Sequence, residues 1–437
     1  MKKIDLIFDQ YVNDLEQLVA IPSVLDESST DYPFGKHIQV ALEKMIEIAK
    51  KMGFSTFIDP DGYYGYAEIG EGEMFGVLGH LDVVPTGALS DWESEPFKLK
   101  RKDNKLYGRG TQDDKGPTLA AMYALKLLLE DGYTLSKKVR FIFGTDEETL
   151  WRGIAAYQEK EVMPTAGFSP DSTFPLVYAE KGLLQCKIIG KSSNIVFNGG
   201  DAYNSVPSKV KYILDKQAQF KSNLDKYGFE YTKDLEVLGK AVHAQKADTG
   251  INAIVRTFIA MKDIYPNSNA IKFVCETFNE DANAKSIFGE LADEFSGKLM
   301  FNLGKFNFDL DKEELNIDIR IPVTVDKELV VEKLREVASK YDLEYEEFDW
   351  LRSIYVPTDS DLVVNLMSAY QEVTNDFESK PMSSGGATYA RAMDNCVAFG
   401  AVFDSSRKTE HQANEHVYEE DIKKAMMVYM KAFEKLV

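Results

Sequence analysis

The first part of the chain alternates helical and strand-like patterns of apolar residues. Apolar positions recur every three or four residues over 6–20 and 37–52, which predicts two amphipathic helices. A third helix is predicted over 117–131, with Pro117 near its first turn and Gly132 just past its end. Short apolar runs on either side of the third helix predict strands at 64–69 and 74–79 before it and at 139–144 after it. This order of elements predicts an α/β fold with a mostly parallel central sheet.

The middle of the chain has a different pattern, in which apolar and polar residues alternate. Residues 297–308 and 314–321 predict two strands of a hairpin, joined by a turn at 309–312. Helices are predicted at 251–263 and 326–340. We therefore expect an α+β domain inserted into the α/β domain. The remaining part again predicts α/β structure, with helices at 360–376 and 419–435 around a strand at 395–403.

These patterns divide the chain into three consecutive parts that form two domains. Residues 1–186 and 356–437 are expected to form the α/β domain. Residues 187–355 are expected to form the inserted domain. A chain of 437 residues is long enough for two hydrophobic cores without disulfides.

Composition narrows the classes of partner and the compartment. With 51 Lys and Arg against 71 Asp and Glu, the formal charge is −20, which argues against nucleic acid or an anionic membrane as the main partner. No uncharged apolar run approaches the roughly 20 residues of a membrane helix, and the start lacks the apolar core of a signal peptide. The three cysteines are widely spaced, as in a reducing compartment. We expect a cytoplasmic protein.

Candidate chemistry begins with one of the five histidines. His80 ends the strand predicted at 74–79, and Asp82 follows it by two residues. Ligands bind at the carboxyl ends of strands in parallel α/β sheets. A neutral imidazole there can bind a metal ion while Asp82 holds the proton on the other ring nitrogen. A solvated loop histidine is the alternative.

Acidic residues follow other predicted strands in the same way. Asp113 and Asp114 lie in a glycine-rich loop before the helix at 117, where a helix cap is the alternative explanation. Asp146, Glu147 and Glu148 follow the strand at 139–144 directly. Further polar clusters are Ser169-Pro170-Asp171-Ser172 and Glu410-His411-Gln412-Ala413-Asn414-Glu415-His416. Each alone is typical of a surface loop, but together they provide imidazole and carboxylate ligands for two divalent ions such as Zn, Mn or Co.

Five motifs in a fixed order now resemble a known family. They are GHLDVVP, YGRGTQDDKGP, TDEET, SPDS and HQANE, and they resemble the M20 metallopeptidases. Within that family the chain is most similar to the PepV-type dipeptidases of bacteria, enzymes of the Xaa-His dipeptidase or carnosinase type. The resemblance implies a zinc-peptidase-like catalytic domain with an inserted α+β lid.

The resemblance also implies a dinuclear centre and the role of each residue in it. His80, Asp113 and Asp171 would hold one metal ion, and Asp113, Glu148 and His411 the other. Glu147 would be the general base that acts on a metal-activated water, and Asp82 would orient His80. Zn is the expected metal, with Mn or Co as alternatives. The family further implies a cis peptide bond between Asp113 and Asp114.

The inserted segment resembles the family's lid, which implies residues that contact the substrate. His243 would stabilise the oxyanion of the tetrahedral intermediate. Asn204 and Arg320 would bind the backbone and carboxylate of the substrate. Gly386 and Arg391 lie in a segment, Ser384-Gly385-Gly386-Ala387-Thr388-Tyr389-Ala390-Arg391, that resembles the loop at the carboxylate end of the site.

The resulting hypothesis is a metal-dependent dipeptidase that acts on small peptides with a free carboxylate. An M20 deacylase, specific for N-acyl amino acids or succinyl-diaminopimelate, is the main alternative, because it would share the metal ligands and differ in lid contacts. A non-catalytic metal or amino-acid binding protein is a second alternative, although none of the expected ligands is missing. The long inserted segment favours a monomer.

Overall fold

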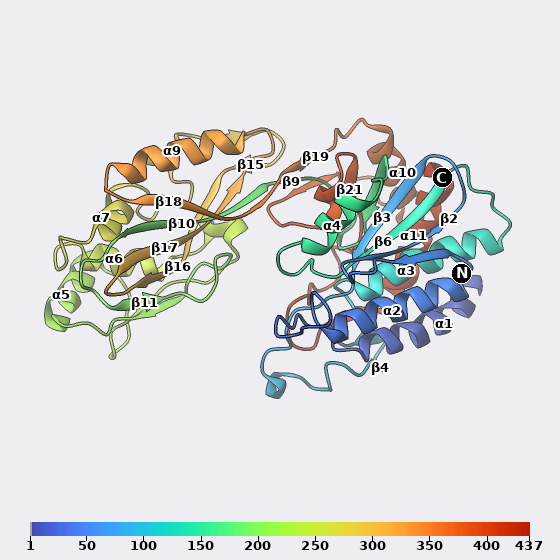
Figure 1. The fold of residues 1–437 in the computed structure, drawn as a ribbon, viewed down its shortest axis with the longest axis horizontal. Helices are drawn as coiled ribbons and strands as arrows, with labels where there is room; N and C mark the ends of the chain where they lie inside the picture. Colours follow the sequence, from blue (N-terminus) through green and yellow to red (C-terminus); the bar gives the residue numbers. More distant parts are fainter. Residues whose placement is uncertain (1) are drawn as a thin grey trace. The chain divides into compact units, whose positions relative to one another are not determined.

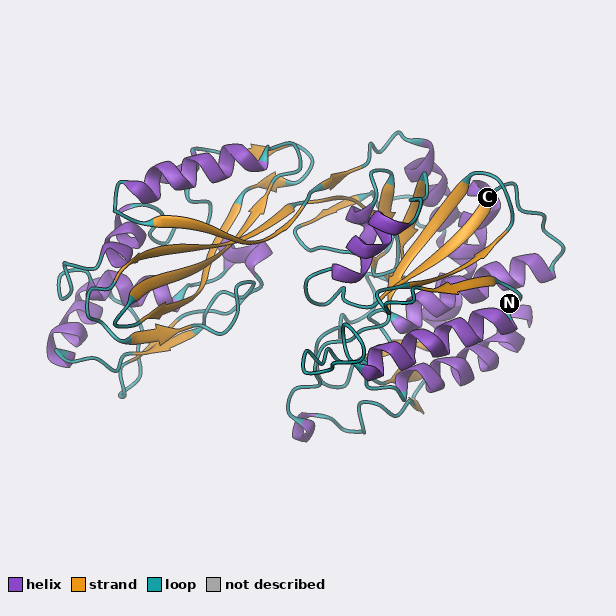
Figure 2. Ribbon diagram, in the orientation of Figure 1, coloured by secondary structure: helices purple, strands orange, loops and turns teal. Residues whose placement is uncertain are grey.

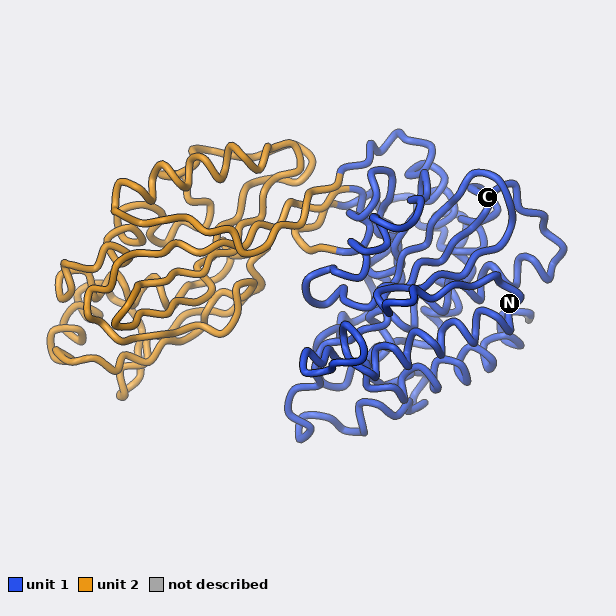
Figure 3. The backbone as a smooth tube through the Cα atoms, in the orientation of Figure 1, with its two compact units in different colours: residues 1–178, 355–382, 388–437 blue, residues 179–354, 383–387 orange. Residues whose placement is uncertain are grey.

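The structure, a computed structural model, describes residues 2–437 and divides into two compact units (Figure 3). The first unit comprises the chain up to Tyr178, together with Tyr355–Met382 and Thr388–Val437. The second comprises Ala179–Ile354 and Ser383–Ala387. The second unit starts eight residues before the expected boundary at 187, because the whole of β10 (Gly182–Lys191) pairs within its sheet. It also takes in residues 383–387, which lie far beyond the expected end at 355.

The first unit is built on a nine-stranded mixed sheet whose centre is parallel. The strand order is β1-β2-β6-β3-β7-β21-β9-β19, and β20 pairs with β9. The four central strands β6, β3, β7 and β21 run parallel, while β1, β2 and β9 add antiparallel pairs on the flanks. The bounds are β1 Ser55–Ile58, β2 Gly65–Ile69, β3 Met74–His80, β6 Lys138–Gly144, β7 Ala166–Ser169, β9 Val177–Glu180, β19 Ile354–Tyr355, β20 Met382–Ser384 and β21 Cys396–Ala398.

Helices cover both faces of this sheet (Figures 1 and 2). On one face α11 packs its aromatic side chains on the sheet, with the ring of Tyr429 stacked 5.4 Å from that of Phe168. On the other face Tyr157 of α4 accepts a hydrogen bond from Arg140 of β6. The helices of this unit are α1 Lys2–Val19, α2 Lys36–Lys51, α3 Lys115–Glu130, α4 Arg152–Lys160, α10 Asp361–Thr374 and α11 Glu419–Leu436. The expected helices are confirmed, although α3 starts two residues earlier than predicted.

One predicted strand is interrupted. The apolar run at 395–403 forms β21 and then, after a break, β22 (Ala401–Val402), which pairs with β8 (Ser172–Thr173) in a separate two-stranded sheet. The break falls at Gly400, whose φ of +79° lies in the left-handed region that favours glycine. A further small sheet joins β4 (Lys100–Lys102), β5 (Lys105–Tyr107) and β23 (His416–Tyr418).

The second unit is an antiparallel five-stranded sheet with helices on one face. The strand order is β11-β16-β17-β10-β18, and the expected hairpin is β16 and β17. Along β17, Leu315, Ile317 and Ile319 join the hydrophobic core under the helices. The residues between them, including Asp318 and Arg320, lie on the opposite face because side chains alternate along a strand. The bounds are β11 Phe197–Gly199, β16 Met300–Phe308, β17 Lys312–Ile321 and β18 Glu344–Leu351.

The helices of the second unit include both that were predicted. They are α5 Gln217–Tyr227, α6 Ala253–Met261, α7 Asn269–Glu276, α8 Lys285–Phe288 and α9 Lys327–Ser339. Short strand pairs complete the unit, namely β12 (Lys209–Lys211) with β13 (Glu236–Leu238) and β14 (Ala292–Asp293) with β15 (Gly297–Lys298). No helix among the described residues is long and apolar enough to cross a membrane.

Candidate metal centre

The carboxyl ends of three parallel strands carry polar side chains to one edge of the sheet. His80 is the last residue of β3 and lies beside Gly144, the last residue of β6, in register. Glu147 and Glu148 follow β6, and Asp171 follows β7. Gly79 is needed before His80, because a Cβ atom there would lie 1.8 Å from the hydroxyl of Thr118 on α3. The close approach of α3 therefore fixes the end of β3.

Asp113 lies between the two imidazoles, with one oxygen toward each. Its Oδ1 is 2.8 Å from Nε2 of His80, and its Oδ2 is 3.0 Å from Nε2 of His411. A carboxylate in this arrangement can provide one oxygen to each of two cations. The Asp113–Asp114 peptide bond is cis, as the sequence resemblance implies.

Two further carboxylates complete the two halves of the cluster. Oε2 of Glu148 is 3.1 Å from Nε2 of His411, and Oδ2 of Asp171 is 3.6 Å from Nε2 of His80. Glu147 also reaches the cluster, because it offers an oxygen within 4.8 Å of the ligand atoms of His80 and Asp171. The structure thus brings together all five predicted ligands and the predicted base.

The electrostatics of the cluster favour bound cations. Burial, with the charges of Asp171, Glu148 and Asp113, raises the pKa of Glu147 well above its usual value. Burial and Asp113 raise the pKa of Asp171 to about 7. Partial loss of hydration lowers the pKa of His411, but hydrogen bonds to Asp113 and Glu148 outweigh it and raise that pKa to about 11. Acids packed this closely bind protons or cations in place of their lost hydration.

The hydrogen bonding of the donor atoms is also consistent with a bound metal ion. Nε2 of His80 and Oδ1 of Asp113 are buried, lie 2.8 Å from each other, and have no further hydrogen-bond partner among the described residues. Buried polar atoms are normally paired, so atoms of this kind are expected to bind an ion. Imidazole nitrogens with carboxylate oxygens are a donor set that suits Zn, Mn or Co.

Asp82 contacts His80 through its backbone rather than through its carboxylate. Nδ1 of His80 lies 3.0 Å from the backbone oxygen of Asp82 and 3.5 Å from Oδ1 of its side chain. The carboxylate accepts the backbone N–H of Glu148 at 3.0 Å. Asp82 therefore supports one imidazole ligand and one carboxylate ligand at once.

Asp114, adjacent to the bridging residue, is fully buried. Its Oδ2 accepts hydrogen bonds from the hydroxyl of Thr118 at 2.7 Å and from the backbone N–H of His80 at 3.3 Å. Burial and the charge of Asp171 raise its pKa well above the usual value. The side chain thus supports the end of β3, a role that its sequence position alone does not indicate.

Two of the residues expected to contact the substrate lie side by side in the second unit. His243 forms a β-bridge with Ser205, and the backbone N–H of Ala244 donates to the oxygen of Asn204 at 2.8 Å. Nδ1 of His243 accepts the N–H of Gln245 at 3.3 Å. The side chain of His243 is exposed.

Arg320 is held in a buried ion pair on the polar face of the same unit. Its Nε and NH2 donate to the two carboxylate oxygens of Asp318 at 2.6 and 2.9 Å. Its NH1 donates to the backbone oxygen of Gly385 at 2.8 Å, in the segment that also contains Gly386. Arg391 belongs to the first unit, where it is buried in the short 3-10 helix Tyr389–Ala392.

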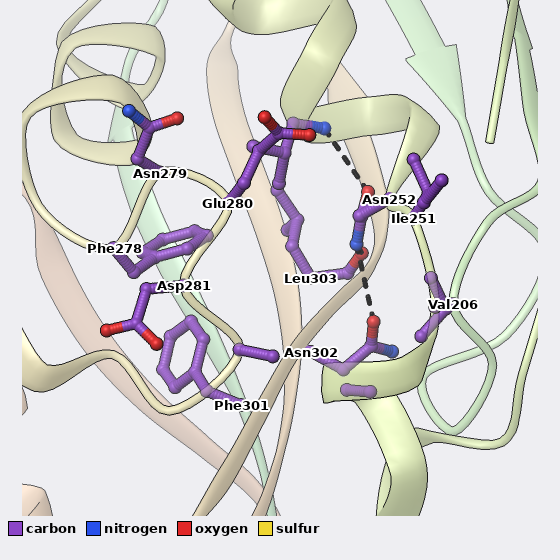
Figure 4. Close-up of a pocket in the computed structure, with 14 residues that line it drawn as sticks. Val206, Ile251, Asn252, Phe278, Asn279, Glu280, Asp281, Phe301, Asn302 and Leu303 are labelled. Carbon is purple, nitrogen blue, oxygen red and sulfur yellow. Dashed lines mark hydrogen bonds between the residues drawn. The ribbon is translucent and has the colours of Figure 1, made fainter. Parts of the chain in front are cut away.

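Two asparagines that sequence reasoning did not identify, the buried Asn302 and the half-buried Asn252, support the loop of Asn204. Nδ2 of Asn302 donates to the backbone oxygens of Tyr203 and Ser205 at 2.8 and 3.0 Å. Nδ2 of Asn252 in turn donates to Asn302 and to the oxygen of Leu303 (Figure 4). Asn252 and Asn302 line a cavity of about 60 Å³ together with Glu280 and Asp281. A polar residue within an apolar strand pattern was the available indication of this network.

Comparisons with known proteins agree with this geometry. The model of Peptidase family M20/M25/M40 matches residues 76–435, which is most of the chain. The chain belongs to this family. It is 33% identical over 464 aligned positions to a Bacillus subtilis (strain 168) protein named "Putative dipeptidase YtjP", covering 100% of this chain and 98% of that one. A Staphylococcus aureus (strain USA300) protein, "Putative dipeptidase SAUSA300_1697", is 34% identical over 99% of this chain and 98% of its own.

Solved structures of the same family share the fold across both units. The dipeptidase Dug1p of Saccharomyces cerevisiae matches with a TM-score of 0.63 at 14% identity, covering 99% of this M20 chain and 97% of its own. Human carnosine dipeptidase 1 matches at 0.61 with 18% identity, covering 99% and 98%. The YXEP protein of Bacillus subtilis, described as a dinuclear metal binding peptidase, matches at 0.55 with 12% identity, covering 99% and 100%. These comparisons confirm the predicted family, the α/β fold with an inserted domain, and a metal-dependent peptidase.

Proposed function

We propose that this M20 peptidase is a dinuclear dipeptidase that hydrolyses dipeptides with a free carboxylate. The observation that carries the proposal is the position of Asp113, whose two oxygens face His80 and His411 separately, with a further carboxylate beside each imidazole. The curated relatives named as dipeptidases, which align over nearly the whole chain, support the choice of substrate class.

Two divalent ions fit the ligands in two sets. His80, Asp113 and Asp171 would hold one, and Asp113, Glu148 and His411 the other. When bound, such ions polarise the scissile carbonyl and lower the pKa of a water molecule. We propose Zn as the metal, since nitrogen and oxygen donors suit it, with Mn and Co as alternatives that reconstitution distinguishes.

Glu147 is proposed as the general base. Its carboxylate belongs to the cluster, and its raised pKa reflects burial among other acids. A carboxylate in this position accepts a proton from the attacking water and returns it to the leaving amine. Asp82 maintains the geometry by accepting bonds from His80 and from the backbone of Glu148.

Residues of the second unit are proposed to bind the rest of the substrate. His243 would donate to the developing oxyanion, and Asn204 would bind the substrate backbone. Arg320 would pair with the free carboxylate, a contact that suits a guanidinium, with Gly386 and Arg391 near that end. The guanidinium of Arg320 is oriented for a fixed role by Asp318.

We further propose that the enzyme acts as a monomer, since the long inserted segment resembles a lid that can close the site within one chain, and that it acts in the cytoplasm, since its three cysteines are widely spaced. Light scattering of the purified protein tests the oligomeric state, and cell fractionation tests the compartment. A stable dimer or a recovered extracellular protein would contradict the respective proposal.

A substrate panel tests the proposed function. The metal-free protein, reconstituted separately with Zn, Mn or Co, is assayed on a set of dipeptides and on matched N-acyl amino acids. The proposal predicts hydrolysis of dipeptides, with much slower hydrolysis of the N-acyl compounds and of dipeptide amides, which lack the carboxylate. Cleavage of only the N-acyl compounds would identify a deacylase instead, and binding of ions without hydrolysis of any compound would indicate a non-catalytic protein.

A further inference from the structure

One glutamate contacts the loop of the bridging ligand from within the protein. Glu415 is fully buried, and its Oε1 accepts the backbone N–H groups of Gly110, Gln112 and Asp113 at 3.0, 2.9 and 3.2 Å. The last of these is the N–H of the bridging residue itself. Its Oε2 pairs with NH1 of Arg109 at 2.7 Å, and Arg109 is also buried.

A contact in the opposite direction starts from Gln112. Its Oε1 accepts the N–H groups of Thr409 and Glu410 at 2.6 and 2.9 Å, so it holds the residue that directly precedes His411. Its Nε2 donates to the backbone oxygens of Arg407 and His416, both at 3.2 Å. Each loop therefore provides one side chain that binds the backbone of the other.

We propose that Glu415 and Gln112 form a reciprocal clasp that sets the distance between the ligands Asp113 and His411. They are positioning residues, because they act through the backbone of the ligand loops and belong to neither set of proposed ligands. The inference rests on the dinuclear centre of the proposed function and assigns what holds its two halves in place.

The loop of His411 needs such support. The side chain of His411 is 54% exposed, so the surrounding core does not fix it by packing. Its backbone has a φ of +60°, a left-handed conformation that is uncommon for residues other than glycine. A ligand held in this way keeps its place through hydrogen bonds to its loop, and the N–H of the preceding residue, Glu410, donates to Oε1 of Gln112.

The contacts of Glu415 with Arg109 and with the backbone of the 108–113 loop also account for the burial of its carboxylate. The carboxylate pairs with the buried Arg109 and accepts three backbone N–H groups, and these contacts replace its lost hydration. A carboxylate that accepts three converging N–H groups fixes three peptide planes of one loop. Supporting contacts of this kind change metal affinity by about 10- to 100-fold when removed from other metal sites.

The test measures ion binding in the absence of substrate. Full-length wild type, Glu415→Ala and Gln112→Leu are freed of metal by chelation and titrated with Co²⁺, whose visible spectrum reports the coordination geometry. Glu419→Gln is the matched control, because Glu419 is also a largely buried glutamate paired to an arginine, Arg101, at 2.7 and 2.8 Å. Circular dichroism verifies that each variant is folded.

The clasp predicts that Glu415→Ala and Gln112→Leu each weaken Co²⁺ binding about tenfold or more and alter the spectrum. Glu419→Gln is expected to lose thermal stability while keeping the affinity and spectrum of the wild type. If Glu415→Ala does not fold, the Co²⁺ affinity and visible spectrum of Gln112→Leu test the inference instead. Wild-type affinity and spectrum in the folded variants would overturn the inference. A wild type that binds two ions but cleaves no dipeptide would overturn the proposed function alone.

Discussion

At the scale of residues, the site depends on a few carboxylates that differ in their surroundings. Asp113 faces two imidazoles, and Asp114, its neighbour, bonds to a threonine and to the backbone of His80. These two adjacent aspartates therefore have different roles. Asp113 belongs to the cluster, and Asp114 supports the strand that carries His80. The sequence places both in a glycine-rich loop but does not tell them apart; the resemblance to known motifs does.

Glu147 is the residue whose replacement separates chemistry from metal binding. Glu147→Gln keeps the size of the side chain and removes its ability to accept a proton. We expect kcat for dipeptide hydrolysis to fall by about 10²- to 10⁴-fold, the usual contribution of a general base. Steady-state kinetics and metal analysis of the same preparation measure this. If Glu147→Gln kept most of the wild-type turnover at full metal content, another group would be the base.

His243 has a prediction of its own, since its exposed side chain contributes little to packing. We expect His243→Ala to lower kcat by about 10²- to 10³-fold, as removal of an oxyanion donor does, with little change in melting temperature. His37→Ala is the matched control, because His37 is an exposed histidine on α2 of the first unit. Equal activities for the two variants would contradict the role of His243.

At the scale of elements, periodic patterns were sufficient for most of the long helices and most of the central strands, but they did not predict α4, α5, α7 or α8. They failed where the chain leaves a sheet without losing its apolar character, as at Gly400 between β21 and β22. They also gave no indication of Glu415, because its partners in the 108–113 loop lie about three hundred residues earlier in the chain. The proposed metal ligands could be named from the sequence because strand ends and known motifs mark them, whereas the residues that support them depend on tertiary contacts.

The polar face of β16 gives a prediction on stability and substrate binding together. Asn302→Ala removes the donor to the backbone oxygens of Tyr203 and Ser205, both of which are partly buried. We expect a loss of about 1–3 kcal/mol in the free energy of unfolding, and a higher KM because the loop of Asn204 is released. Asn307→Ala on the same strand is the control. An unchanged KM in a measurably destabilised variant would show that this loop does not contribute to substrate binding.

The end of α10 gives a prediction on pH. Asp376 accepts hydrogen bonds from Tyr370, from the side chain and N–H of Ser379 and from the N–H of Glu378, and these lower its pKa to about 2. Its carboxylate therefore adds stability that is present above the unfolded pKa of about 3.9 and is lost as the pH falls toward 2.

Urea unfolding of wild type and Asp376→Asn from pH 6 to pH 3 measures this contribution. We expect the wild type to be more stable by a constant margin above about pH 5, and the margin to shrink below about pH 4. A margin that does not change with pH would mean that the charge of Asp376 contributes nothing.

At the scale of the whole molecule, the net charge of −20 includes a cluster of acids that the fold concentrates at one edge of a sheet. Metal ions would neutralise that cluster, so their removal should leave buried acids to repel one another. We expect chelation to lower the melting temperature of the protein, and Zn, Mn or Co to restore it. The first unit carries the proposed metal ligands, and the second carries Asp318 and Arg320 on one face of its sheet.

The central claim is that two divalent ions on the ligands around Asp113 drive dipeptide hydrolysis. The most direct measurement titrates the metal-free protein with Zn, Mn or Co and records hydrolysis of a dipeptide against the number of ions bound per chain. We predict almost no hydrolysis without metal and a maximum at two bound ions. Full hydrolysis by the metal-free protein, or none with two ions bound, would contradict the account.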